Sequence, residues 1–262
     1  MNLDLSNKNA LVCGSSQGMG KAIAIQLAKM GANVTLFARN LETLNQVKDE
    51  LANNGSQEHF AICADFSDTA AVARALDEHL RIVPTFHILI NNTGGPAPGP
   101  ANTAESDAFL AAFNQHLINN HQLAQRVVNG MKEAGYGRII NVISTSVKQP
   151  LPNLGVSNTV RGAVASWAKT MANELGQFNI TVNNVLPGAT NTVRLEQIIK
   201  NKAAKKGVSI EEMEEEEKSI IPMRRFGDAE EFADAVAFLA SPAAGYITGV
   251  SIPVDGGRTS CL

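Results

Sequence analysis

Short aliphatic runs alternate with segments of helical period along nearly the whole chain, and this alternation restricts the possible folds more than any other feature. The helical segments include Gly18–Met30, Leu41–Asn53, Thr69–Leu80 and Ala229–Leu239. Strands that alternate with helices form parallel sheets, which are buried on both faces. The sequence therefore predicts an α/β fold, a doubly wound parallel sheet of about seven strands with helices on both faces. The predicted strands are Asn9–Cys13, Asn33–Ala38, His59–Ala64, Phe86–Asn91, Gly137–Ser144, Ile180–Leu186 and Val250–Val254.

Composition narrows the class of protein. A chain of 262 residues that is 44% apolar, without a linker rich in Gly, Ser or Pro, is expected to form one domain, 1–262. The net charge of −3 predicts no general attraction to nucleic acid or anionic membranes. Three scattered cysteines predict neither a metal site nor a disulfide framework. The polar N-terminus and the lack of a long apolar run predict a cytoplasmic protein.

A glycine-rich turn follows the first predicted strand and reads Cys13-Gly14-Ser15-Ser16-Gln17-Gly18-Met19-Gly20. A helical pattern begins within it. Glycine lets a phosphate approach the backbone N–H groups, and a helix N-terminus adds partial positive charge. Glycines also serve ordinary tight turns. The position between a strand and an amphipathic helix nevertheless favours a Rossmann-like dinucleotide site.

A second motif combines Asn141-Val142-Ile143-Ser144 with Ser157-Asn158-Thr159-Val160-Arg161, which begins thirteen residues after Ser144. Together with the glycine turn, it resembles the short-chain dehydrogenase/reductase family, including its 3-oxoacyl-carrier-protein reductase-like members. That family carries serine, then tyrosine, then lysine four residues later. Here the corresponding residues are Ser144, Ser157 and Arg161. The resemblance implies a nicotinamide-dependent oxidoreductase acting on a carbonyl/alcohol pair of a small molecule, with altered acid–base residues.

The resemblance also implies a set of cofactor-binding residues. The cofactor-binding half would span about 1–145, and the catalytic helix, lid and C-terminal part about 146–262. Asp65 and Phe66 would lie near the adenine, and Arg161 would hold the nicotinamide ribose. The remaining implied contacts are Gly14, Ser16, Gln17, Gly18, Met19 and Gly20 in the turn, Asn92, Thr93 and Gly94 after the fourth strand, and Pro187, Gly188, Thr190 and Thr192 beside the nicotinamide.

The end of the second strand, Phe37-Ala38-Arg39-Asn40, bears on the choice of cofactor. NAD-specific relatives usually place an acidic residue at the Ala38 position, where it binds the ribose 2′-hydroxyl. Here no carboxylate repels a 2′-phosphate, and Arg39 can pair with it. NADP(H) is therefore favoured over NAD(H).

The expected proton-transfer groups are replaced. A serine hydroxyl at Ser157 is far less acidic than a phenol with an ordinary pKa of about 10. Arg161 lies about one helical turn after Ser157, but its guanidinium stays protonated and does not relay a proton. The two tyrosines, Tyr136 and Tyr246, are expected to lie far from the nicotinamide.

His116 occupies the position at which the family generally places an asparagine of its proton relay. A histidine within a helix is most often structural. Because imidazole titrates near pH ~6.5, His116 is also the one replacement acid that the resemblance offers. Two interpretations remain open, an active oxidoreductase with atypical acid–base residues and a catalytically inactive NADP(H)-binding sensor or scaffold.

Two further features concern a lid over the substrate site and an interface between subunits. The segment 191–219 would form the lid, and its run Glu211–Glu217 is interpreted as a solvated helix face. The scarcity of basic residues around Asn173 argues against a carrier-bound acyl substrate. The family resemblance predicts a homotetramer or dimer built on the helices Phe109–Met131 and Ser157–Gln177. The apolar stripe Val160, Val164, Trp167 and Met171 is expected to be exposed in a monomer.

Overall fold

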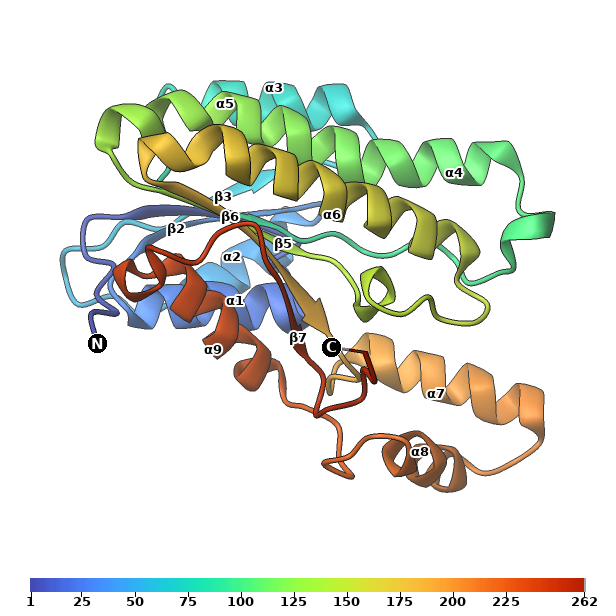
Figure 1. The fold of residues 1–262 in the computed structure, drawn as a ribbon. Helices are drawn as coiled ribbons and strands as arrows, with labels where there is room; N and C mark the ends of the chain where they lie inside the picture. The colour runs from blue at the N-terminus through green and yellow to red at the C-terminus, as the bar shows by residue number, and fades with distance from the viewer. Residues whose placement is uncertain (262) are drawn as a thin grey trace.

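The computed structural model describes residues 1–261, which form one seven-stranded parallel sheet with the order β3-β2-β1-β4-β5-β6-β7 (Figure 1). This architecture confirms the predicted doubly wound α/β fold. The order reverses between β1 and β4, and ligands of such sheets bind outside the carboxyl ends of the strands at this point. The strands are β1 Asn9–Cys13, β2 Asn33–Ala38, β3 Phe60–Cys63, β4 Ile88–Asn91, β5 Gly137–Val142, β6 Ile180–Pro187 and β7 Ser251–Val254.

Helices cover both faces of the sheet. In Figure 1, α3, α5 and α6 lie above the sheet, whereas α1 and α9 lie below it. The helices α7 and α8 form a separate lobe beside the C-terminal end of β6. The helices are α1 Gly18–Lys29, α2 Leu41–Asp49, α3 Thr69–His79, α4 Ser106–Phe113, α5 Asn119–Ala134, α6 Gly155–Leu175, α7 Val193–Lys206, α8 Ile210–Ser219 and α9 Ala229–Ala240.

Alternate residues of β1 face two separate hydrophobic cores. Ala10 and Val12 belong to the core that packs against α1 and α9. Leu11 and Cys13 belong to the core under α3, α5 and α6. Successive side chains of a strand point to opposite faces. A strand buried on both faces must therefore be apolar throughout, as the aliphatic runs of the sequence are.

A ladder of polar side chains, three asparagines and a serine, crosses four neighbouring strands of the sheet. Asn91 Nδ2 donates to Asn141 Oδ1 at 2.8 Å, and Asn141 Nδ2 donates to Asn184 Oδ1 at 3.0 Å. Asn184 Nδ2 in turn donates to Ser251 Oγ at 3.1 Å. The four residues are paired in register across β4, β5, β6 and β7. A shift of any strand by one residue would bury these amides without partners, so the ladder specifies the register.

β3 and β4 begin later than predicted, and the reason is the same in both cases. β3 starts at Phe60 because the ring of His59 accepts a hydrogen bond from Val34 N at 3.1 Å. β4 starts at Ile88 because the ring of His87 accepts one from Asn9 N at 3.0 Å. In each case an imidazole takes the place of a main-chain acceptor.

The ends of several other elements also differ from the prediction, and three of them are informative. β5 ends at Val142 rather than Ser144, because Ser144 caps a short 3₁₀ turn over Thr145–Val147. β7 begins at Ser251 rather than Val250. The helix predicted over Leu41–Asn53 ends at Asp49. Element ends are where propensity is weakest, so such shifts are expected.

The predicted continuous helix Phe109–Met131 is interrupted. A π turn over Asn114–Ile118 separates α4 from α5 and contains His116. Its hydrogen bonds span one residue more than those of an α-helix, so side chains on either side of it change direction. His116 lies in this turn, and its side chain is buried.

The expectation that α6 exposes an apolar stripe is wrong for two of its four residues. Val160 and Val164 are fully buried inside the protomer, where α6 packs against the rest of the fold. Trp167 and Met171 are partly buried against the core beneath α5 and α6. The stripe therefore faces mainly inward, and the 3.6-residue period alone did not distinguish a core face from an interface.

The acidic run of α8 pairs with lysines. Lys202 and Lys206 of α7 contact Glu217 at 2.6 Å and Glu216 at 2.5 Å. Lys218 contacts Glu214 and Glu215 on α8 itself. Apart from the partly buried Glu217, these carboxylates are largely accessible, which agrees with a solvated face. Such ion pairs hold α7 and α8 together only weakly.

Candidate active site

The glycine turn has no room for side chains at two of its positions. A Cβ placed on Gly20 would lie 2.1 Å from the carbonyl oxygen of Gly14. A Cβ placed on Gly14 would lie 2.5 Å from the carbonyl oxygen of Asn92. Gly14 and Gly18 also have positive φ angles of 60° and 56°. The close contact of β1, α1 and the β4 turn therefore requires glycine at these positions.

The N-terminus of α1 is open to a ligand. Its N-cap residue, Gln17, makes no side-chain hydrogen bond to the first turn. The turn is fixed from behind by Asn92, whose Nδ2 donates to Cys13 O at 3.3 Å and to Gly14 O at 3.2 Å. The first N–H groups of a helix lack partners within the helix. The geometry around Ser16, Gly18 and Met19 thus fits a pyrophosphate, whose charge the helix dipole would stabilise.

The predicted adenine end lies where β2 and β3 finish. Arg39 and Asp65 are both exposed there. Asp65 accepts a hydrogen bond from Ser67 N at 2.9 Å, which lowers the pKa of its carboxyl group, and the charge of Arg39 contributes in the same direction. Phe66 is buried, with its ring centroid 5.0 Å from that of Phe37. The side chain of Phe66 therefore belongs to the core, and only its backbone can reach a ligand.

The predicted nicotinamide end follows β6. Gly188 N donates to Val254 O at 2.9 Å, and a Cβ on Gly188 would lie 2.5 Å from Asp255 Cα. Thr190 is buried, and Thr192 caps α7 by accepting a hydrogen bond from Leu195 N at 3.3 Å. The methyl group of Thr192 lies 3.4 Å from the Cβ position of Gly18. Thr192 and the glycine turn, 174 positions apart in sequence, thus face the same space.

Two of the predicted catalytic residues, Ser144 and Arg161, lie at the end of β5. Ser144 is partly buried, and its Oγ accepts a hydrogen bond from Ser146 N at 3.1 Å. Arg161 Nη1 donates to Val142 O at 3.1 Å, which anchors the guanidinium two residues before Ser144. Ser157 is partly buried one turn earlier on α6. Burial and the nearby charge of Arg194 lower the pKa of Arg161 to about 10, so the side chain stays cationic at neutral pH.

The two tyrosines lie away from these positions. Tyr136 Oη donates to Ala240 O at 2.6 Å, before the start of β5 and hence at the amino edge of the sheet. Tyr246 is fully exposed. Neither phenol replaces the missing tyrosine.

His116 does not behave as the expected acid. Its Nδ1 lies 2.6 Å from Thr93 Oγ1, and its Nε2 is buried without a hydrogen-bond partner among residues 1–261. Burial, followed by the charges of Arg161 and Arg194, lowers the pKa of His116 to about 3. The imidazole is therefore neutral at physiological pH. This pKa disagrees with the expectation that His116 titrates near pH ~6.5, and its role as a replacement acid stays a prediction.

This depressed pKa predicts a stability effect at mildly acidic pH. Below the ordinary histidine pKa of about 6.5, the unfolded chain binds a proton at His116 that the folded protein does not, until the pH falls to about 3. The free energy of unfolding should then decrease by up to about 1.4 kcal/mol for each pH unit over this window. Urea unfolding of the unmodified protein and of His116→Asn at pH 7 and pH 5 measures it. Between pH 7 and pH 5 the unmodified protein should lose about 2 kcal/mol of unfolding free energy relative to His116→Asn. An unchanged difference between the two proteins would contradict the assignment.

One residue near the catalytic positions was missed by the sequence analysis. Arg194, the second residue of α7, extends its Nη2 to within 3.2 Å of the Cβ position of Gly95. Arg161 Nη2 lies 3.9 Å from the same point. A single arginine in a lid segment is not a recognisable motif. Only the fold brings α6, α7 and the turn after β4 to one place.

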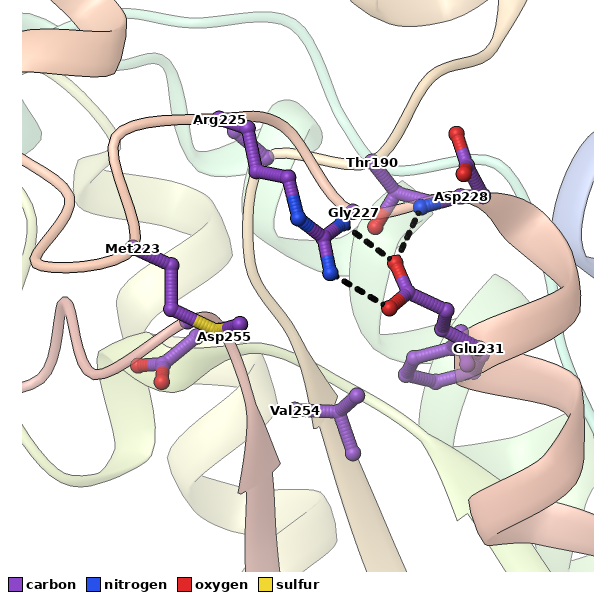
Figure 2. A pocket seen from close by; sticks show the side chains of 11 residues that line it. Thr190, Met223, Arg225, Gly227, Asp228, Glu231, Val254 and Asp255 are labelled. Atoms are coloured by element: carbon purple, nitrogen blue, oxygen red, sulfur yellow. Dashed lines mark hydrogen bonds and ion pairs between the residues drawn. The ribbon is translucent and has the colours of Figure 1, made fainter.

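A separate cavity of about 100 Å³ lies between the start of α9, the segment that precedes it and the end of β7, and is shown in Figure 2. Arg225 spans it with two hydrogen bonds of 2.6 Å to Glu231. Hydrogen bonding from Arg225, then from Asp228 N, lowers the pKa of Glu231 to about 2. Thr190 is the one predicted site residue in its lining. This arrangement fixes the connection between the lid and α9 and contains none of the catalytic positions.

Comparisons with known proteins agree with this geometry. Residues 14–259 match a family model described as enoyl-(acyl carrier protein) reductase. The chain is 35% identical over 259 residues to the NADPH-dependent reductase BacG of Bacillus subtilis, covering 98% of this chain and 100% of that protein. It is 32% identical to the 3-oxoacyl-[acyl-carrier-protein] reductase FabG of Pseudomonas aeruginosa over 257 residues, covering 97% of this chain and 98% of FabG.

A solved structure has the same fold over the whole chain. The L-sorbose reductase of Gluconobacter frateurii, crystallised with NADPH and L-sorbose, superimposes with a TM-score of 0.93 at 28% identity and covers the whole of both chains. The similarity thus extends from the glycine turn to the C-terminal residues and is not restricted to the cofactor half.

Proposed function

The chain belongs to the short-chain dehydrogenase/reductase family, and we propose that it is an NADP(H)-dependent oxidoreductase that reduces a carbonyl group of a small molecule or oxidises the corresponding alcohol. The observation that carries the proposal is the close-packed glycine turn at the open N-terminus of α1, with Ser144 and Arg161 at the same edge of the sheet. This combination supplies both a place for a dinucleotide and a polar group for a carbonyl.

The cofactor would be held by the residues named from the resemblance. Backbone N–H groups of Ser16, Gln17, Gly18 and Met19 would bind the pyrophosphate, and Arg39 the 2′-phosphate. Asp65 would lie at the adenine, and Thr93 and Gly94 near the ribose. Pro187, Gly188, Thr190 and Thr192 would border the nicotinamide. The preference for NADP(H) is supported by Arg39, by the absence of a carboxylate at Ala38, and by BacG and L-sorbose reductase, which are described with NADPH.

The chemistry at the carbonyl would use what the site retains. When bound, NADPH supplies a hydride to the carbonyl carbon. The Ser144 hydroxyl would donate a hydrogen bond to the carbonyl oxygen. The buried charge of Arg161 would stabilise the negative charge that develops on that oxygen. Ser157 lacks the acidity of a phenol, so no side chain at this position would act as a general acid, and the alkoxide formed by hydride transfer would be protonated from the solvent.

Anaerobic NADPH consumption against a broad panel of ketones and aldehydes tests the proposed function. Consumption that depends on both the carbonyl compound and Ser144 supports it, and loss of turnover in Ser144→Ala is the expected control. If the protein binds NADPH but reduces no compound in the panel, the proposal is wrong. The chain would then be a catalytically inactive NADP(H)-binding protein.

Arg39 provides a test of cofactor choice. We expect the unmodified protein to bind NADPH more tightly than NADH by calorimetry. Arg39→Ala should reduce this preference by roughly ten- to a hundredfold, because it removes a charge-assisted contact worth about 1.5–3 kcal/mol. Arg81→Ala is the matched control, because Arg81 is an exposed arginine between α3 and the start of β4. Equal affinities for NADPH and NADH in the unmodified protein would refute the assignment.

Assembly as a homotetramer or dimer is part of the proposal. The exposed side chains Leu110 and Phe113 on α4, together with the partly buried Trp167 and Met171 on α6, are the apolar groups available for contact. Light scattering at micromolar concentration should give a multiple of the 27.8 kDa chain mass. Leu110→Lys should shift the equilibrium towards smaller species, and a monomer at all concentrations would contradict the prediction.

A further inference from the structure

Two guanidinium groups converge near Gly95. Arg194 reaches this point from α7 and Arg161 from α6, and each places its Nη2 within 4 Å of the Cβ position of Gly95. Because Gly95 has no side chain, it does not fill the space beside the two guanidinium groups. Like charges brought together in this way repel each other unless an anion lies between them.

No acidic residue compensates this charge in the part of the chain that the structure describes. Arg161 is 6% exposed, and its one hydrogen bond goes to the neutral carbonyl of Val142. The Arg194 side chain is exposed and makes neither a hydrogen bond nor an ion pair with any of residues 1–261. By contrast, Arg225, in the connection between α8 and α9, is paired with Glu231. Arg161 is thus a buried cation without a counter-ion, which is costly, and an anion bound between it and the exposed Arg194 would stabilise the arrangement.

The pKa values agree with a net positive environment. Desolvation and then the charge of Arg194 lower the pKa of Arg161, and no carboxylate acts in the opposite direction. Both arginines likewise lower the pKa of the neighbouring His116. The two arginines thus act on a neutral imidazole, and no carboxylate is among the causes of either pKa shift.

Arg161 and Arg194 lie close to the place at which Ser144 would hold the reacting carbonyl. The loop after β4 begins at Asn92 on the glycine turn and ends at Gly99, whose oxygen accepts a hydrogen bond from Gly155 N, the first residue of α6. Gly95 thus lies between the cofactor turn and the catalytic helix. Arg161 is also anchored two residues before Ser144. An anion held by the pair would be close to a carbonyl oriented by Ser144.

We propose that Arg161 and Arg194 form the binding site for a carboxylate of the substrate, and that the substrate class is a small oxo acid whose carboxylate lies close to its carbonyl group. The inference rests on the proposed function and specifies its substrate. Guanidinium groups bind carboxylates through paired hydrogen bonds, and Arg161 keeps donors free for this purpose beside its single bond to Val142.

The cofactor pyrophosphate is the other anion that could reach two arginines. It already has a suitable place in the structure, at the open N-terminus of α1, and Arg39 is available for the 2′-phosphate. Arg194 belongs instead to the lid that follows Thr192. The substrate carboxylate is therefore the better match, and the experiment separates the two anions.

Matched pairs of carbonyl compounds test the proposal. In each pair a methyl group replaces the carboxylate, as in acetone against pyruvate and 2-hexanone against 2-oxohexanoate. NADPH consumption with the unmodified protein should favour the oxo acids. Arg194→Gln should raise the KM for the oxo acid on the order of ten- to a hundredfold, with a smaller change in kcat, and so reduce the preference over the neutral ketone. Arg194→Lys should recover part of the loss.

Lys200→Gln is the matched control, because it removes one positive charge from an exposed position on the same helix. It should leave the preference for the oxo acid unchanged. NADPH affinity is measured in parallel by calorimetry. If Arg194→Gln weakens NADPH binding by the same factor as it raises KM, the pair serves the cofactor phosphates and the proposal is overturned. Equal turnover of oxo acids and neutral ketones by the unmodified protein overturns it as well.

A binding measurement keeps this inference separable from the proposed function. Acetate, butyrate and hexanoate are not reduced, and they are titrated calorimetrically into the NADP⁺ complex. If no carbonyl compound is reduced but a carboxylate binds and Arg194→Gln abolishes that binding, the carboxylate site stands while the proposed reaction fails. If none of the carboxylates binds, the inference is wrong, whatever the outcome of the turnover measurements.

Discussion

Gly20→Ala is expected to lower the affinity for NADPH by more than about a hundredfold and to destabilise the fold. The added methyl group would lie 2.1 Å from Gly14 O and 2.7 Å from Asn92 Nδ2. Main-chain atoms cannot move aside without shifting the whole turn. A shifted turn would lose at least two hydrogen bonds to the cofactor phosphates, each worth about 1.5–3 kcal/mol. Overpacking at this position should also cost about 1–3 kcal/mol of unfolding free energy.

Calorimetry with NADPH and urea unfolding measure the two effects. Gly176→Ala is the matched control, because Gly176 has helical φ and ψ angles of −55° and −36° and a Cβ there would meet no atom within 4 Å. That variant should bind NADPH normally and be as stable as the unmodified protein or slightly more so. If Gly20→Ala bound NADPH with unchanged affinity, the glycine turn would not be the cofactor site.

The double variant Ser157→Tyr with Arg161→Lys is expected to raise carbonyl reduction by roughly a hundredfold or more, the scale of general acid catalysis. It restores an ionisable hydroxyl and places a smaller cation one helical turn away. Ser157 is only partly buried, so space exists on that side of α6 for a larger side chain. The measurement is kcat/KM for whichever carbonyl compound the unmodified protein reduces most rapidly. If the unmodified protein reduces none, the full panel is used.

Single variants identify the source of any gain. Ser157→Tyr alone should gain less, because the long guanidinium of Arg161 would crowd the new phenol. Arg161→Lys alone should gain nothing, because no acid is restored. Adding Ser144→Ala to the double variant should remove the gain if the new tyrosine works with Ser144 on one carbonyl. If the double variant binds NADPH but shows no gain, the missing tyrosine is not what limits the reaction.

The cofactor half could be predicted from sequence because its signals are local. The turn Gly14–Gly20 is continuous in the chain, and glycine at each close contact is required by atoms nearby in sequence or by the adjacent strand. The strand runs follow from burial on both faces, which makes every position of a strand apolar. The start of β3 was placed one residue early and that of β4 two residues early, because His59 and His87 replace main-chain acceptors. Aliphatic patterns carry no information on such bonds.

The electrostatic properties of the site could not be read from the sequence. His116 was assigned an ordinary pKa, whereas burial and two arginines lower it to about 3. Arg194 carried no motif, and it acquires significance only because α7 brings it next to Arg161. Desolvation and charge–charge interaction depend on distances between residues that are remote in the chain.

The sequence by itself determined the parallel sheet, the glycine turn and the replacement of tyrosine and lysine by Ser157 and Arg161, since these depend on local composition and order. The tertiary structure decided that Val160 and Val164 face the core and that His116 is neutral. It also decided that two unpaired arginines share one space beside Ser144. Packing and the low polarity of the interior set these properties, and both arise only when distant segments come into contact.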